Sequence, residues 1–310
     1  MTVLVTGGAG FVGSHLCEAL VSAQRSVICV DSFLTGSRDN VAHLLSSPLF
    51  TLVEQDITEG LDVTEPLTAV AHLASPASPV DYLRLPVETL LVGSVGTRNA
   101  LEVARRHDAR FLLASTSEVY GDPLVHPQRE DYWGNVNPVG PRAVYDEAKR
   151  FAEALTTAYR TAHGVDTTIA RIFNTYGPRM RAHDGRVVPT FIRQALVGEA
   201  LTVAGLGTQT RSLCHVSDTV AGLLGLLASD HAGPMNIGNS DEYTVLEIAE
   251  TIQRLCGSSS PVTHIRLPVD DPQRRCPDTE LASTVLDWKP SVALDDGLAE
   301  TIAWFRCAGR

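Results

Sequence analysis

Residues 2–13 read TVLVTGGAGFVG, and this stretch determines the fold class. Its apolar start predicts a short strand over residues 2–5, and Gly7, Gly10 and Gly13 follow with the spacing G-x-x-G-x-x-G. Apolar residues then recur with helical spacing over residues 11–23. Glycines at such a turn let the backbone approach a pyrophosphate, which the helix N-terminus attracts. The stretch therefore predicts a dinucleotide-binding strand–turn–helix unit.

The next strands favour NAD over NADP. Asp31 closes a strand predicted over residues 27–30, where its carboxylate can accept hydrogen bonds from ribose hydroxyls. Asp56 and Ile57 follow the third strand and are expected near the adenine. We therefore expect NAD as cofactor, bound by Gly7, Gly10, Phe11, Val12, Gly13, Asp31, Ser32, Phe33, Thr35, Gly36, Asp56, Ile57, Leu73, Ser75, Ala114, Tyr145, Lys149 and Thr175.

Strands and helices alternate through the first half of the chain. Further strands are predicted at 49–54, 69–73, 110–114 and 165–171, and helices at 87–106 and 144–163. This alternation implies a parallel sheet with right-handed crossovers. The expected fold class is α/β, with a Rossmann-like doubly wound parallel sheet in residues 1–176 to which residues 212–230 return.

The second half of the chain is less regular. Helices are predicted at 189–198, 217–228, 245–256 and 294–305, strands at 201–203 and 235–237, and an ordered loop at 268–277. We expect residues 177–310 to form a smaller α/β domain that binds the substrate. The cleft between the two domains is the expected site.

The composition limits the classes of function. The chain has 310 residues, is 44% hydrophobic and 20% charged, as in soluble globular enzymes, and its net charge of −11 argues against a nucleic-acid partner. Its six cysteines lack the spacing of metal ligands or of a disulfide framework, which favours a reducing compartment and no metal. A strand beginning at residue 2 leaves no room for a signal peptide, and the apolar runs are too short to span a membrane. A cytoplasmic protein without a membrane partner is expected.

Tyr145 and Lys149 carry the main indication of chemistry. Residues four apart share one face of a helix, so the ammonium is expected to lower the pKa of the phenol. Such a phenol can take a proton from a sugar hydroxyl and return it. Ser115 and Thr116 end a strand, where ligands of open sheets bind, and Glu118 adds a second titratable group. The combination predicts more than simple oxidation of an alcohol.

Several long blocks carry a family resemblance. With the glycine turn and Tyr145-x-x-x-Lys149, the chain resembles the extended short-chain dehydrogenase/reductase superfamily, and within it the UDP-glucuronate decarboxylases, also called UDP-xylose synthases. The blocks span nearly the whole chain and are HLASPAS from His72, ASTSEVYGDP from Ala114, HPQREDYWGNVNPVGPRAVYDEAKR from His126, RIFNTYGP from Arg171, DGRVVPTFIRQAL from Asp184, GTQTRSLCHVSD from Gly207 and DDPQRRCPD from Asp270.

The resemblance implies NAD-dependent conversion of UDP-glucuronate to UDP-xylose through a 4-keto intermediate. Tyr145 would exchange the proton of the C4 hydroxyl, and Glu118 would assist at the ring through water. Thr116 and Ser117 would hydrogen-bond the sugar, and Arg275 would contact it near the reacting centre. A homodimer is implied in the same way.

An acidic protein that binds a UDP-sugar must gather its arginines around the diphosphate. The blocks of the second half carry arginines 179, 181, 186, 193 and 211, which resemble the family's UDP-binding stretches. The substrate-binding residues expected from the resemblance are Tyr82, Asn174, Arg179, Arg186, Arg193, Arg211 and Arg275.

Four alternatives share part of this pattern. A decarboxylase that releases the UDP-4-keto-pentose uses nearly the same residues. A nucleotide-sugar 4-epimerase needs no glutamate after Ser-Thr-Ser, and a 4,6-dehydratase usually has Asp-Glu where this chain has Ser117-Glu118. A non-catalytic NAD-binding regulator tends to lose the tyrosine–lysine pair, which this chain keeps.

Overall fold

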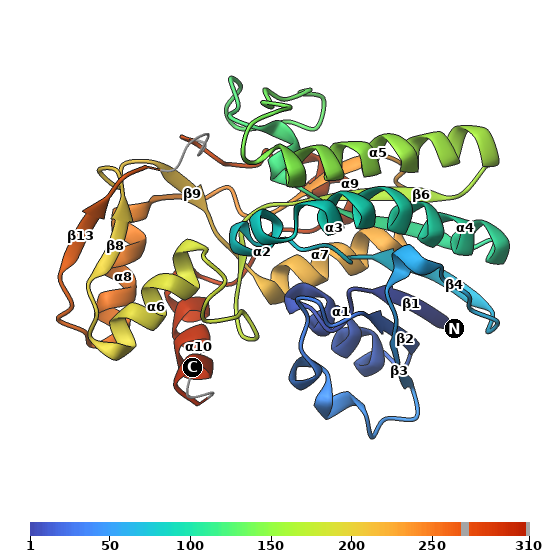
Figure 1. Ribbon diagram of the computed structural model, residues 1–310, viewed down its shortest axis with the longest axis horizontal. Coiled ribbons are helices and arrows are strands. Elements are labelled where there is room, and N and C mark those ends of the chain that lie inside the picture. The colour runs from blue at the N-terminus through green and yellow to red at the C-terminus, as the bar shows by residue number, and fades with distance from the viewer. Residues whose placement is uncertain (268–272, 308–310) are drawn as a thin grey trace.

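Seven parallel strands form the main sheet of the computed structural model, which describes residues 1–267 and 273–307. Their order across the sheet is β11-β6-β5-β4-β1-β2-β3 (Figure 1). The strands are β1 (Thr2–Thr6), β2 (Ser26–Asp31), β3 (Phe50–Glu54), β4 (Leu67–His72), β5 (Arg110–Thr116), β6 (Thr167–Ile172) and β11 (Pro234–Ile237). The predicted α/β class with a doubly wound parallel sheet is confirmed.

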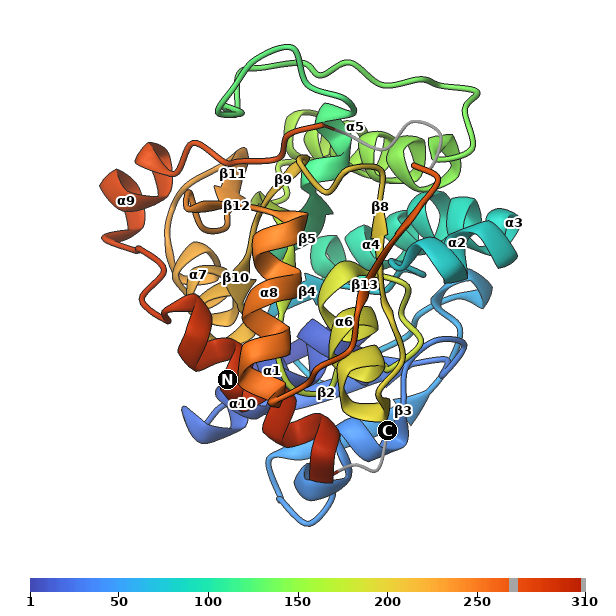
Figure 2. The ribbon, with the colours of Figure 1, turned by 90° about the vertical axis from the view of Figure 1, so that its left-hand side faces the viewer.

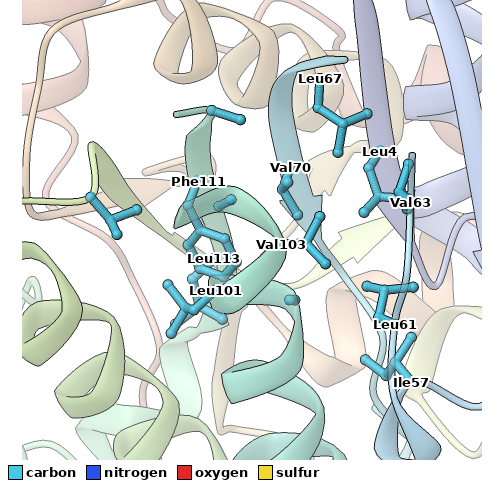
Figure 3. Packing of buried hydrophobic residues seen from close by; sticks show 14 of the residues in the cluster. Leu4, Ile57, Leu61, Val63, Leu67, Val70, Leu101, Val103, Phe111 and Leu113 are labelled. Carbon is cyan, nitrogen blue, oxygen red and sulfur yellow. The ribbon is translucent and has the colours of Figure 1, made fainter. Parts of the chain in front are cut away.

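Helices cover both faces of this sheet, as Figure 1 shows. One face carries α3 (Pro86–Leu91), α4 (Thr97–His107) and α5 (Ala143–His163), and the other carries α1 (Phe11–Ser22), α7 (Val216–Ala228) and α9 (Glu280–Leu286). Strands covered on both sides are apolar along their whole length, which is why β1 reads as a continuous apolar run in the sequence. Leu4, Val70, Phe111 and Leu113 of the strands belong to one buried cluster with Leu101 of α4, and Phe111 and Leu113 lie nearest to Leu101 (Figure 3).

The long helix predicted over residues 87–106 is interrupted. A π-helical turn at Val92–Gly96 separates α3 from α4. Two glycines allow a close approach there, because a Cβ on Gly93 would lie 2.8 Å from the Cβ of Ala148 on α5, and one on Gly96 3.0 Å from Ile57. Hydrophobic periodicity does not reveal such a one-turn change, so the prediction gave one continuous helix.

The second part of the chain forms a smaller unit, which faces the viewer in Figure 2. It contains the parallel pair β8–β13 and the antiparallel pair β9–β12. Strands β7 and β10 form a third, parallel pair of their own. The elements are α6 (Val187–Val197), α8 (Val245–Cys256), α10 (Leu294–Cys307), β7 (Thr175–Tyr176), β8 (Leu201–Ala204), β9 (Thr210–Ser212), β10 (Cys214–His215), β12 (Glu242–Thr244) and β13 (Val262–Ile265). Helices α6, α8 and α10 share one apolar core with β8. A further short helix, α2 (Pro79–Arg84), precedes α3.

The chain crosses between the two parts more than once. After β10 it returns through α7, which packs on α1, to β11, which pairs with β6 at the edge of the main sheet. We therefore propose that the returning segment of the dinucleotide-binding part extends to Ile237 and not only over 212–230. Residues 268–272, which include part of the predicted loop and the start of the DDPQRRCPD block, lie outside the described residues. Within the described ranges, no helix has the length and apolar character needed to cross a bilayer.

Candidate active site

A cavity of about 350 Å³ opens at the carboxyl ends of the central strands. Ligands of open α/β sheets bind at this edge. Most residues expected to bind NAD line this cavity, namely Gly7, Gly10, Phe11, Val12, Gly13, Asp31, Ser32, Thr35, Gly36, Asp56, Ile57, Leu73, Ser75, Ala114, Tyr145, Lys149 and Thr175. Of the other expected site residues, Thr116, Ser117, Glu118, Asn174 and Arg186 line it as well.

The glycine turn fits a dinucleotide. Gly7 has a φ of +70°, and a Cβ there would lie 2.6 Å from the backbone of Ala74. A Cβ on Gly13 would lie 2.1 Å from the carbonyl oxygen of Gly7. Helix α1 begins after Gly10 with no side-chain cap among the described residues, so its first N–H groups are free to bind phosphate oxygens. The turn has the shape and polarity that a pyrophosphate requires.

Asp31 closes β2 beside this turn. Its Oδ2 accepts the N–H of Ala9 at 2.9 Å and its Oδ1 accepts the N–H of Phe33 at 2.8 Å. Each carboxylate oxygen retains a second lone pair, so both can still accept a ribose hydroxyl. Phe33 is not part of the cavity wall and has a φ of +56°, with the guanidinium of Arg38 4.4 Å from its ring centroid. The contribution of Phe33 is therefore its backbone N–H, which fixes Asp31.

Tyr145 and Lys149 are both buried on one face of α5. The Nζ of Lys149 donates to the carbonyl of Ala114 at 2.9 Å and lies 5.8 Å from the ring centroid of Tyr145. Burial raises the pKa of Tyr145 well above its usual value, although the charge of Arg186 and a hydrogen bond with Thr116 act in the opposite direction. Burial also lowers the pKa of Lys149 to about 8. The prediction that Lys149 lowers the pKa of the phenol is therefore wrong for the protein without ligands, because loss of solvent around the buried phenol raises this pKa more than nearby charges lower it.

Glu118 lies in a two-arginine clamp at the end of β5. Both terminal nitrogens of Arg275 donate to its two oxygens, and Nη2 of Arg142 donates to Oε2 at 2.5 Å. Burial opposes the negative charge, but Arg275 and Arg142 outweigh it and lower the pKa of Glu118 to about 2. Thr116 accepts the N–H of Glu118 at 3.3 Å and begins the short helix at Ser117–Tyr120.

Arg142 is a residue that the sequence reasoning missed. It stands at the start of α5, three positions before Tyr145, and this spacing places both on one face of the helix. That spacing could have identified it. Arg275 was predicted, and it is buried although it does not line the cavity itself.

Asp146 adds a second carboxyl beside this clamp. It is 5% exposed, and its Oδ1 has no hydrogen-bond partner within residues 1–267 and 273–307. Burial, and then the charge of Glu118, raise the pKa of Asp146 to about 7. The cluster therefore holds one carboxylate that is firmly charged and one carboxyl that is half neutral near neutral pH.

Tyr82 and Asn174 are two of the residues expected to bind the substrate. Tyr82 does not line the cavity, but its ring stacks on that of Tyr145 with centroids 5.2 Å apart and an interplanar angle of 8°. The Nδ2 of Asn174 is buried without a hydrogen-bond partner among the described residues, so it can donate to a ligand oxygen. Arg186 donates to the carbonyl of Ala77 at 2.7 Å and lies on the cavity wall.

The expected arginine cluster is only partly assembled. Arg181 lines the cavity together with Arg186 and pairs with Asp81. Arg179 instead pairs with Glu18, Arg193 forms an ion pair with Glu199 at 2.8 Å, and Arg211 donates to the carbonyl of Thr210 at 2.8 Å. These three do not line the cavity within the described part of the chain, so a role for them in binding a diphosphate stays a prediction.

The sequence profile of the "NAD dependent epimerase/dehydratase family" matches residues 3–238, most of the chain and all seven strands of the main sheet. The chain belongs to this family. NAD is therefore the cofactor, and the cavity at the glycine turn, with Asp31 beside it, is built to hold it.

Within this family, the chain is most informatively compared with individual relatives. The chain is 52% identical to "UDP-glucuronic acid decarboxylase 6" of Arabidopsis thaliana, over 96% of this chain and 87% of that protein. It is 52% identical to "UDP-glucuronic acid decarboxylase 1" of Danio rerio, over 98% of this chain and 72% of that protein. A solved structure of UDP-glucuronic acid 4-epimerase from Bacillus cereus, in complex with UDP-glucuronic acid and NAD, is 27% identical with a TM-score of 0.89, covering 99% of this chain and 100% of that one. The resemblance to UDP-glucuronate decarboxylases is thus confirmed.

Proposed function

We propose that this protein decarboxylates UDP-glucuronate to UDP-xylose with NAD as cofactor. The observation that carries the proposal is the buried Glu118, clamped by Arg275 and Arg142, in the cavity that also contains Tyr145 and Thr116. A simple alcohol dehydrogenase needs only the tyrosine, lysine and hydroxyl groups. The relatives that share half of the residues of this chain are named as UDP-glucuronic acid decarboxylases.

The chemistry begins and ends at C4 of the sugar. When bound, NAD supplies a hydride acceptor and later a hydride donor. Tyr145 takes the proton of the C4 hydroxyl during oxidation and returns it during reduction. Because burial raises its pKa, the phenol is protonated at neutral pH and suited to giving a proton back. To accept one, it depends on the charge of Arg186 and the hydrogen bond with Thr116, which both favour the phenolate.

Decarboxylation follows from the position of the ketone. A ketone at C4 is β to the C6 carboxylate, so the electron pair of the breaking C5–C6 bond is held as an enolate while carbon dioxide leaves. C5 must then receive one proton. Glu118 is charged over the whole working pH range, so we assign it the ordering of the water that delivers this proton. Arg275 and Arg142 hold the carboxylate in place for that role.

The substrate would lie between the glycine-turn end of the cavity and Tyr82. We assign Ser117 and Thr116 to hydrogen bonds with the sugar, and Asn174 and Arg186 to oxygens of the sugar or the diphosphate. Arg181, which also lines the cavity, is a further candidate for the diphosphate. Arg186 is the best placed of the expected arginines, because it lines the cavity and its charge acts on Tyr145.

The product identifies the reaction. Purified protein incubated with UDP-glucuronate is expected to give a nucleotide sugar lighter by one carbon dioxide, with no net rise in NADH absorbance. An unchanged mass would rule out decarboxylation and favour the 4-epimerase alternative. A 4-keto-pentose with stoichiometric NADH would favour the decarboxylase that stops before the second reduction. A 4,6-dehydratase would instead remove water from UDP-glucose, which unlike UDP-glucuronate has a C6 hydroxyl that can leave.

Glu118→Gln tests the assignment of the carboxylate. The variant is nearly isosteric, so NAD binding should remain while turnover falls by about 100-fold or more, the usual contribution of a positioned acid–base group. Asp131→Asn removes the same negative charge at an exposed position on a surface loop and is the matched control. Normal turnover in Glu118→Gln would remove the role assigned to Glu118.

We propose that the protein is a homodimer formed through α3 and α5. These helices lie side by side and expose Val87, Leu90, Leu91 and Phe151, with fractional exposures of 61%, 42%, 44% and 51%. An apolar face of this kind is typical of a subunit interface. The six cysteines, all free in the described part of the chain, support a reducing compartment, for which we propose the cytoplasm.

A further inference from the structure

Three potential metal ligands from separate segments meet outside the cavity. They are the imidazole of His126, the carboxylate of Glu242 at the start of β12, and the thiol of Cys276, and their ligand atoms lie within 4.8 Å of one another. Within residues 1–267 and 273–307 this is the one such group of three. We propose that these residues bind a divalent transition-metal ion of the zinc class. The cysteine spacing predicted no metal site, and these three ligands could not be grouped from the sequence because they are far apart in the chain.

The donor set suits zinc. Zn²⁺ is bound by cysteine sulfur, histidine nitrogen and carboxylate oxygen in tetrahedral sites, with bonds of about 2.0–2.3 Å. Such bonds place the ligand atoms about 3.5 Å apart. The Nε2 of His126 and the Oε2 of Glu242 are 2.8 Å apart, and no two ligand atoms are more than 4.8 Å apart. Each distance therefore needs to change by only about 1 Å for a metal to bind. A soft thiolate in the set disfavours Mg²⁺ and Ca²⁺.

One coordination position would remain open to solvent. The side chains of His126 and Glu242 are 29% and 25% exposed, whereas Cys276 is 5% exposed. The buried sulfur would form the inner side of the site, and the imidazole and carboxylate its outer side. A water molecule can then complete the tetrahedron.

The backbone around the ligands is already fixed. Gln128 and Cys276 exchange hydrogen bonds, since the N–H of Gln128 donates to the carbonyl of Cys276 at 2.8 Å and the N–H of Cys276 donates to Oε1 of Gln128 at 2.9 Å. The hydroxyl of Thr210 donates to Oε1 of Glu242 at 2.6 Å, which leaves Oε2 for the metal. A hydrogen bond to the non-ligating oxygen orients a carboxylate toward an ion.

The thiol proton must leave for the metal to bind. Burial raises the pKa of Cys276 to about 11, and its Sγ donates to the carbonyl of Ser240 at 3.3 Å. The contact between Nε2 of His126 and Oε2 of Glu242 must also open for the metal to enter. Metal affinity should therefore rise with pH, as for any site whose ligand must lose a proton.

Cys276 links the proposed site to the active site. Its neighbour Arg275 forms the clamp on Glu118, and the carbonyl of Arg275 accepts hydrogen bonds from the N–H and the hydroxyl of Ser212. In Figure 2 the segment that carries both residues runs past β9 and β12 toward α9. A metal held by Cys276 would therefore fix the segment that positions Arg275.

Cobalt is the probe for this proposal, because Co²⁺ bound to thiolate has a charge-transfer band in the near ultraviolet. Titrating the full-length, NAD-loaded protein with Co²⁺ is expected to give this band at one ion per chain, and Zn²⁺ should abolish it. Zn²⁺ should also raise the melting temperature, and Mg²⁺ should not. Cys276→Ser should lose both the band and the rise in melting temperature.

Two further variants control the experiment. Cys307→Ser removes an exposed thiol at the end of α10 and should leave the titration unchanged. His126→Ala, at a partly exposed position, should keep the fold and weaken Co²⁺ binding by at least about tenfold. Absence of the band in the wild-type protein, its persistence in Cys276→Ser, or an unchanged affinity in His126→Ala would overturn the proposal.

Discussion

Glu118 keeps its negative charge in a buried environment because two guanidinium groups flank it. Replacing Arg142 by Met removes one cation while Arg275 remains paired. Loss of a nearby positive charge raises the pKa of a carboxylate by about 1–3 units, so the acid limb that Glu118 sets near pH 2 should move to about pH 3–5. Turnover measured from pH 3 to pH 8 tests this. An unmoved acid limb, identical to that of the wild-type protein and of Arg129→Met at an exposed surface position, would contradict the role of Arg142.

Asp146 differs from Glu118 in that ionisation of its carboxyl destabilises the folded protein. Its folded pKa of about 7 exceeds the ordinary value of 3.8, so the folded protein binds more protons than the unfolded chain between these values. The free energy of unfolding should therefore fall as pH rises from about 4 to about 7. Asp146→Asn should remove this loss and raise the melting temperature by several degrees at pH 8, but much less at pH 5.

The neighbouring residue gives the control for this measurement. Glu147→Gln changes the same charge on α5, but Glu147 is more exposed than Asp146. It should change the pH dependence of the melting temperature far less than Asp146→Asn, because the charge of Glu147 is the weakest of the causes that act on the pKa of Asp146. Equal shifts at pH 5 and pH 8 in Asp146→Asn would show that the effect does not come from the titration of Asp146.

For single residues, the sequence identified the reactive side chains of the cavity but did not predict how the fold shifts their pKa values. Tyr145, Lys149 and Glu118 were predicted together, and they meet on one cavity wall. The sign of the Tyr145 pKa shift was wrong, because the degree of burial that dominates it cannot be read from a four-residue spacing. Arg193 was grouped with the diphosphate arginines on block similarity alone, and it pairs with a carboxylate next to its own helix.

Helix α1 and its glycine turn form the element that the cofactor needs. Gly13→Ala would bring a Cβ within 2.1 Å of the carbonyl oxygen of Gly7, so the turn must move. Overpacking of this kind costs about 1–3 kcal/mol. Because the NAD-binding conformation of the turn bears this cost, NAD affinity should fall by about 5- to 150-fold. Calorimetric titration with NAD measures the loss. An affinity equal to that of the wild type would mean that the turn is not the pyrophosphate site.

Gly225→Ala is the matched control. Gly225 lies inside α7, and its Cβ would meet Leu286 at 3.6 Å, an ordinary contact. Alanine is favoured over glycine in a helix interior by about 1 kcal/mol. This variant should therefore keep NAD affinity and have a slightly higher melting temperature.

The long elements were predictable and the short ones were not. Strands of the main sheet and helices α5 and α8 match their predicted ranges within a few residues, because apolar periodicity extends over many positions in each. The pairs β7–β10 and β9–β12 have strands of two or three residues, too short to show alternation. They form because distant segments meet, which is information that local sequence does not contain.

At the scale of the whole molecule, the proposed homodimer depends on the apolar face of α3 and α5. Val87→Glu with Leu90→Glu places two charges on this face, and burying them in an interface without partners is unfavourable. The protein should change from dimer to monomer in sedimentation-velocity experiments. Leu206→Glu, at a turn where the side chain is 76% exposed, is the control and should remain dimeric. A wild-type protein that sediments as a monomer would exclude the proposed interface.

The path of the chain back to the main sheet has a consequence for synthesis on the ribosome. Strand β6 obtains its outer neighbour, β11, only when residue 237 has emerged, after much of the smaller unit has been made. Until then β6 presents an unpaired edge, the feature through which nascent chains associate with one another. Because the two units alternate along the chain, we expect the edge of β6 to need protection by a chaperone until β11 has been synthesised.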